Sequence, residues 1–100
     1  MWYHFPVPKL DSGSEPEREV RLVRWLVEEG AQLRKGSRVA IIQVGSESFY
    51  VLANGDGFIR EKMFPNGASV VPCSSLATIN ADGENIPYDR PYSLAERIEP

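Results

Sequence analysis

The sequence predicts an all-β protein in which two small sheets pack face to face. Glycine and proline, eight of each among 100 residues, interrupt the chain at short intervals. The segments between them are short and rich in Val, Ile, Leu and Phe, which is typical of the strands of a sandwich or barrel. A second observation is an internal repeat. Two similar β-units that each have one apolar face can bury those faces against each other as two sheets.

The repeat is visible when LVRWLVEEGAQLRKGSRVAII is placed above IREKMFPNGASVVPCSSLATI. Both segments follow the pattern apolar–x–x–Gly–x–x–apolar–x–x–small–x–x–apolar–Ala–x–Ile, with Gly30 falling on Gly67, an offset of 67 − 30 = 37 residues. Chance does not readily match the whole register. The other matched pairs are Leu22/Ile59, Leu26/Met63, Val27/Phe64, Leu33/Val70, Val39/Leu76, Ala40/Ala77 and Ile42/Ile79.

The first element of the repeat, residues 20–29, fits both a strand and a helical stripe. Val20 and Leu22 alternate as in a strand, but the following apolar residues are also spaced as on a helix face. The counterpart, IREKMFPNG, contains Pro65 and is a poor helix former. We therefore expect strands in both copies.

Between the two copies lies IIQVGSESFYV, in which a polar Gly-Ser-Glu-Ser run separates two β-prone segments. This pattern predicts a hairpin with its tip in solvent. Neighbours on a strand point to opposite faces, so one of Phe49 and Tyr50 should face the core and leave the other available to a partner.

The first 82 residues are expected to form the domain, and residues 83–100 a partly irregular C-terminal extension. Ser93 is followed three residues later by Glu96, a capping-box pattern that predicts a short helix over 93–98. The aromatic residues at both ends either cover the open edges of the small barrel or, in the tail, form a docking segment that a partner orders. These residues are Trp2, Tyr3, Phe5, Tyr88 and Tyr92.

Composition argues against several classes of function. The net charge of −3 is unsuited to nucleic-acid binding. The chain has neither an apolar run of membrane-spanning length nor a signal-peptide pattern, so we expect a cytoplasmic protein without membrane contact. His4 and Cys73 are the only residues of their types, too few for a His/Cys metal site, and no serine has a triad-like context. We expect no catalytic residue and no bound metal.

The residues also resemble the lipoyl domains of dihydrolipoyl acyltransferases from 2-oxo acid dehydrogenase complexes, within the biotinyl/lipoyl family. The resemblance covers roughly residues 7–80. It implies a flattened barrel-sandwich of two small antiparallel sheets with a pseudo-two-fold internal repeat. The residues that carry it are Pro8, Leu10, Trp25, Gly30, Leu33, Gly36 and Val39 in the first half, and Gly57, Gly67, Val70 and Leu76 in the second.

In that family the hairpin between the halves carries the modified lysine at its tip. Counting back from Gly57 places this position on Ser46, or on Ser48 after a two-residue slip. The three lysines, Lys9, Lys35 and Lys62, lie elsewhere in the sequence. Lipoate and biotin are attached as amides, which requires an amine. Because serine and not lysine stands at this position, neither cofactor is expected. Serine carries phosphopantetheine in some carrier proteins, but those are helical bundles with a different recognition surface.

Three functions follow from this comparison. The first is a non-catalytic module that binds an unknown protein, with a component of a dehydrogenase or carboxylase complex as a candidate. The second is a cofactor-carrying accessory domain of an acyl- or carboxyl-transfer complex, modified at an atypical site. The third, a membrane-adaptor or efflux barrel-sandwich, usually has a long helical hairpin for which residues 44–49 leave no room. The candidate interaction surface comprises Gly45, Ser46, Glu47, Ser48 and Tyr50.

Overall fold

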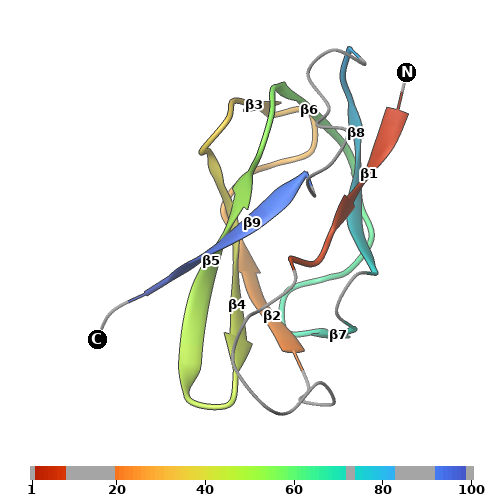
Figure 1. Ribbon diagram of the computed structural model, residues 1–100. Coiled ribbons are helices and arrows are strands. Elements are labelled where there is room, and N and C mark those ends of the chain that lie inside the picture. The colour runs from red at the N-terminus through yellow and green to blue at the C-terminus, as the bar shows by residue number, and fades with distance from the viewer. Residues whose placement is uncertain (1, 9–19, 72–73, 83–91, 99–100) are drawn as a thin grey trace.

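The computed structural model describes residues 2–8, 20–71, 74–82 and 92–98, and within these ranges it is all-β (Figure 1). The predicted fold class, all-β with two antiparallel sheets, is confirmed for this part of the chain. The strands are β1 (Trp2–Pro6), β2 (Val20–Trp25), β3 (Gln32–Leu33), β4 (Arg38–Val44), β5 (Glu47–Ala53), β6 (Gly57–Lys62), β7 (Ser69–Val70), β8 (Ser75–Asn80) and β9 (Ser93–Arg97).

In the described residues one sheet has the strand order β1-β8-β6-β3 and the other the order β7-β2-β4-β5-β9. The two short strands cross between the halves of the chain, because β3 pairs with β6 and β7 pairs with β2. β4 and β5 form the long hairpin at one end of the molecule, as Figure 1 shows. All of these pairings are antiparallel.

The segment that begins at residue 20 is a strand, as the repeat predicted. Val20 and Leu22 are buried and Arg21 between them is exposed, which is the alternation of a strand with one face on the core. The strand ends at Trp25, and residues 26–31 turn the chain toward β3. Its counterpart β6 ends at Lys62, before Pro65.

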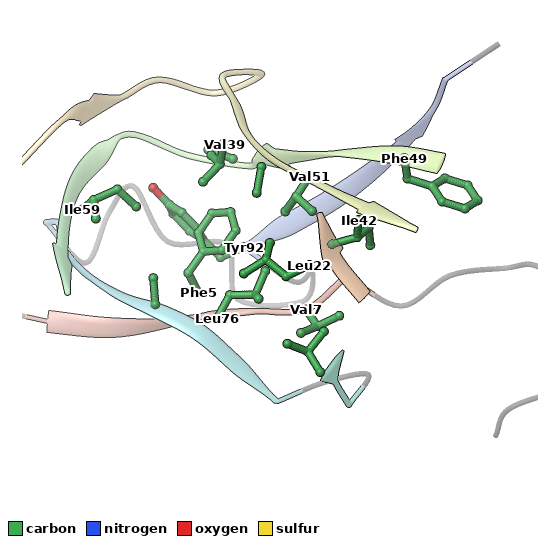
Figure 2. Packing of buried hydrophobic residues seen from close by; sticks show 14 of the residues in the cluster. Phe5, Val7, Leu22, Val39, Ile42, Phe49, Val51, Ile59, Leu76 and Tyr92 are labelled. Carbon is green, nitrogen blue, oxygen red and sulfur yellow. The ribbon is translucent and has the colours of Figure 1, made fainter. Parts of the chain in front are cut away.

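The core lies between the two sheets and draws on both (Figure 2). Phe5 and Leu76 come from one sheet, and Leu22, Ile42 and Val51 from the other, and all five are fully buried. Burying side chains of this size is favourable by about 1.5–3 kcal/mol each before conformational entropy is counted. The two sheets therefore form one packed unit.

The predicted helix over 93–98 is wrong, because Ser93–Arg97 is strand β9 and pairs antiparallel with β5. A helix of six residues gains too few hydrogen bonds to offset its nucleation cost. As a strand, the same segment pairs with the backbone of β5, and the pairing extends to Asn54 N–H with Tyr92 O (2.6 Å) and Ile98 N–H with Ser48 O (2.8 Å). Part of the expected C-terminal extension is thus built into the second sheet.

The aromatic residues at the two ends have different positions. Phe5 and Tyr92 are buried side by side, with ring centroids 5.4 Å apart in an edge-to-face arrangement, and Tyr3 packs against the core. Trp2 lies on the edge strand β1 and is 49% exposed. Tyr88, like Lys9 and Cys73, lies outside the described residues.

Candidate functional site: the hairpin between β4 and β5

The hairpin ends in a two-residue turn, Gly45-Ser46. Val44 pairs with Glu47, so Gly45 and Ser46 alone connect the two strands. Gly45 has a φ of +61°, the left-handed conformation that two-residue hairpin turns require at their first position and that glycine adopts without steric cost. Gly45 and Ser46 are both exposed. The predicted polar tip is therefore present, and Ser46 is at its end.

The remaining predicted surface residues are less accessible. Glu47 and Ser48 are half-buried on the first part of β5, and Ser48 pairs with Gln43 across the hairpin. Phe49 is buried and Tyr50 half-buried, which confirms that one residue of this pair faces the core. Figure 2 shows Phe49 at the margin of the buried cluster. The exposed part of the site is thus the tip itself.

β9 supports the return strand of the hairpin along its outer edge. The Arg97 guanidinium lies 3.3 Å from a carboxylate oxygen of Glu47, the first residue after the turn. The Ile98 amide donates a hydrogen bond to the Ser48 carbonyl. The base of the tip is therefore fixed by backbone pairing on both sides of β5.

A charged and aromatic cluster lies on the outer face of the second sheet, and it includes Arg38 at the end of β4 opposite the tip. The Arg38 guanidinium is 4.2 Å from the centroid of the Tyr50 ring and 3.2 Å from a Glu96 carboxylate oxygen. These three side chains come from β4, β5 and β9 and remain partly exposed. This cluster could not be predicted from the sequence, because Glu96 reaches Arg38 only through strand β9, which was expected to be a helix.

Tyr92, the residue before β9, anchors the beginning of that strand, at the end opposite Arg97. Its hydroxyl donates a hydrogen bond of 2.9 Å to the carbonyl oxygen of Gly55. Burial of the hydroxyl and, to a lesser extent, the nearby Asp56 carboxylate raise the pKa of Tyr92 to about 12. The phenol therefore stays protonated, and able to donate, well above neutral pH.

The two lysines in the described residues lie away from the tip. Lys35 is in the turn that precedes β4, at the opposite end of that strand from Gly45, and its amide donates to Asp56 Oδ1 at 3.1 Å. Lys62 ends β6, and its ammonium nitrogen lies 5.3 Å from the centroid of the Trp25 ring. Neither amine is near Ser46.

The described parts of the chain contain no group of three or more His, Cys, Asp or Glu side chains that could hold a metal ion. In the same parts, no helix has the length and apolar character needed to cross a bilayer. In comparisons with known proteins, no family model and no curated protein matches this sequence.

Proposed function

We propose that this chain is a non-catalytic barrel-sandwich domain of the biotinyl/lipoyl type that has lost its attachment lysine and acts by binding another protein. The observation that carries the proposal is the exposed Gly45-Ser46 turn at the junction between two structurally matched halves. Four lines of support follow.

The first is the correspondence of strands at the offset of 37 residues. At this offset β2 (20–25) corresponds to β6 (57–62), and β3 (32–33) corresponds to β7 (69–70). β4 and β8 begin at the matching positions 38 and 75. β2 and β6 share one burial pattern, as do β3 and β7. In the β2–β4 pair the register shifts after Leu22, and in the β6–β8 pair it shifts at the matching place, after Ile59. These matches support a pseudo-two-fold repeat.

The second is a set of backbone hydrogen bonds that the halves exchange. Gly30 donates to the carbonyl oxygen of Ile59 at 2.8 Å, and Gly67 donates to that of Leu22 at 2.6 Å. In return, Ile59 donates to Ala31 and Leu22 to Ala68. A turn in each half therefore pairs with a strand of the other, as a two-fold arrangement requires.

The third is a pair of side-chain contacts with the same exchange. Asn66 Oδ1 accepts the Trp25 amide and Glu29 Oε2 accepts the Lys62 amide, each at 2.9 Å. Trp25 and Lys62 are 37 residues apart, and so are Glu29 and Asn66. In each case a loop side chain from one half thus accepts a hydrogen bond from the backbone amide of the last strand residue of the other half.

The fourth concerns the chemistry of the tip. Lipoate and biotin are attached through an amide, which needs an amine, whereas Ser46 offers a hydroxyl and Lys35 and Lys62 are placed elsewhere. The residues at this position do not fit either cofactor. An exposed polar turn on a rigid hairpin fits recognition by a protein better.

The absence of an arm is tested by intact-mass measurement after co-expression with a lipoate ligase or a biotin ligase. We expect an unmodified mass for the natural sequence and modification of Ser46→Lys, with Ser48→Lys, two residues further along the chain, as the matched control. A lipoylated or biotinylated natural chain would refute the proposal. Modification of Ser48→Lys alone would show that the alignment with the family is displaced by two residues.

The interaction role is tested with a photo-crosslinking residue at position 46, using position 71 as the control because Val71 is 69% exposed. We expect one protein to be captured from the native host through position 46 and not through position 71. Equal capture at both positions would contradict a role for the tip.

A further inference from the structure

The outer face of the β1-β8-β6-β3 sheet, away from the hairpin, presents two aromatic side chains in one cross-strand row. Trp2 pairs with Asn80, Asn80 with Phe58, and Phe58 with Gln32, so these four residues cross the sheet side by side. We name them the aromatic row. Trp2 is 49% and Phe58 50% exposed, and Asn80 and Gln32 are exposed too. The two exposed rings therefore lie in register on one face of this sheet.

The Trp2 ring is held in place by its neighbours. The His4 ring packs edge-on against it at 5.3 Å, and His4 Nδ1 is 2.9 Å from Ser75 Oγ. The Arg60 guanidinium lies 5.5 Å from the centroid of the Trp2 ring. The position of the Trp2 ring is therefore restrained by His4 and Arg60. Two strand spacings separate Trp2 from Phe58, so the backbone positions that carry the two rings are about 10 Å apart.

The other end of the aromatic row is hollowed. Gln32, Phe58 and Asn80 line a groove of about 280 Å³ together with Asp56 and Asp82. Its lining therefore combines one exposed aromatic ring with two amides and two carboxylates. These polar groups can accept and donate several hydrogen bonds around the edge of a ring stacked on Phe58.

Size and charge restrict the class of ligand. The exposed halves of Trp2 and Phe58 together offer roughly 200 Å² of apolar surface. A stable protein interface buries about 800 Å² on each partner, which is far more. The Asp56 and Asp82 carboxylates and the net charge of −3 disfavour phosphate polymers. A small neutral ligand with flat apolar faces and many hydroxyl groups matches these features, because its faces stack on the rings and its hydroxyls pair with the amides and carboxylates.

We infer that the aromatic row is a binding site for a neutral oligosaccharide. One sugar ring stacks on Phe58, with its hydroxyls hydrogen-bonded to the Asn80 and Gln32 amides and to the Asp56 and Asp82 carboxylates. A second ring along the chain packs against the part of Trp2 that Arg60 leaves exposed. This site is independent of the proposed hairpin function, because it lies on the other sheet and uses none of the hairpin residues.

The test is an NMR and calorimetric titration of the natural chain, carrying any tag at its C-terminus, with cellohexaose, maltohexaose and chitohexaose. We expect saturable binding of at least one sugar, with shifts at the Trp2 indole N–H and at the Asn80 and Gln32 side-chain amides. Trp2→Ala and Phe58→Ala should each weaken binding about tenfold, as expected for the loss of one stacking contact. Leu94→Ala, which removes an exposed apolar side chain of the other sheet, should leave it unchanged.

Three results would overturn the inference. One is the absence of shifts with all three sugars at millimolar concentration. Another is binding that survives both aromatic substitutions while circular dichroism shows that the variants are folded. The last is binding of oligothymidylate in place of the sugars, with loss in both variants, which would assign the rings to nucleobase stacking.

Discussion

The Arg97 guanidinium lies 3.3 Å from the Glu47 carboxylate, so the last strand of the chain is ion-paired to the first residue after the hairpin turn. The two side chains are 57% and 32% exposed. Exposed ion pairs contribute little to stability, because water screens the attraction and ordering two long side chains costs entropy. Backbone pairing with β5 and the burial of Tyr92 should therefore hold β9 more strongly than this pair does.

A double-mutant cycle with Arg97→Ala and Glu47→Ala should give a coupling free energy below about 1 kcal/mol in urea unfolding. The coupling should shrink further at high salt, because added ions screen exposed charges. The Arg38–Glu96 pair, with side chains 57% and 48% exposed, serves as the matched comparison. A salt-independent coupling of several kcal/mol would show that the ion pair, and not the backbone, fixes β9.

Tyr92→Phe should lower the free energy of unfolding by about 1–3 kcal/mol, because it leaves the buried Gly55 carbonyl without its donor. Tyr50→Phe, which removes a hydroxyl from the half-buried outer face of β5, is the control and should have a smaller effect. Equal losses from both substitutions would mean that the Tyr92 hydrogen bond has no special role.

The pKa of Tyr92 also predicts a dependence of stability on pH. The folded state holds the phenolic proton up to about pH 12, whereas the unfolded chain releases it near 10.0, the ordinary pKa of tyrosine. The stabilisation is complete below pH 10 and is lost as the pH rises toward 12, because the unfolded state then binds fewer protons. Unfolding midpoints measured across this window should fall more steeply for the natural chain than for Tyr92→Phe. Parallel curves would contradict the assigned pKa.

The two sheets and the hairpin could be predicted because their signals are local. Glycine and proline mark the turns, and residues such as Val20 and Leu22 alternate with polar neighbours along the strand. The turn at Gly45-Ser46 follows from the same chemistry, since a two-residue hairpin turn needs a left-handed residue.

β9 could not be predicted, because its conformation is decided by a strand far away in the sequence. Residues 93–97 have one large apolar side chain, Leu94, and a capping-box pattern that favours a helix in isolation. Pairing with the edge of β5 overrides that local preference. The Arg38–Tyr50–Glu96 cluster was missed for the same reason, since Arg38 and Glu96 are 58 residues apart.

Thr78→Val should raise the free energy of unfolding by about 1 kcal/mol. Thr78 is only 6% exposed, and its Oγ1 is buried and has no hydrogen-bond partner among the residues that the structure describes. A desolvated hydroxyl without a partner is unfavourable, and a methyl group of similar size removes that penalty. Thr78→Ser, which keeps the hydroxyl and deletes the methyl, should destabilise the fold. A loss of stability in Thr78→Val would indicate that the hydroxyl has a partner in solution.

Gly30→Ala and Gly67→Ala provide a direct test of the proposed repeat. The two glycines have φ values of +89° and +86°, and a Cβ added at either position would meet no atom within 4 Å. The cost of alanine is therefore backbone strain alone, about 1–2 kcal/mol. Because each glycine donates to the matching strand of the other half, both substitutions should lower the free energy of unfolding equally, within about 0.5 kcal/mol.

Gly57→Ala is the contrasting variant for this pair. Its φ lies outside the left-handed region, but the added Cβ would lie 2.8 Å from the Asn80 carbonyl oxygen and 3.2 Å from the Tyr92 hydroxyl. Overpacking against backbone typically costs about 1–3 kcal/mol, and here it should also disturb the Tyr92–Gly55 hydrogen bond. We therefore expect Gly57→Ala to be the most destabilising of the three in urea unfolding. If Gly30→Ala and Gly67→Ala differed by more than about 1 kcal/mol while Gly57→Ala behaved as expected, the halves would not be energetically equivalent and the two-fold interpretation would fail.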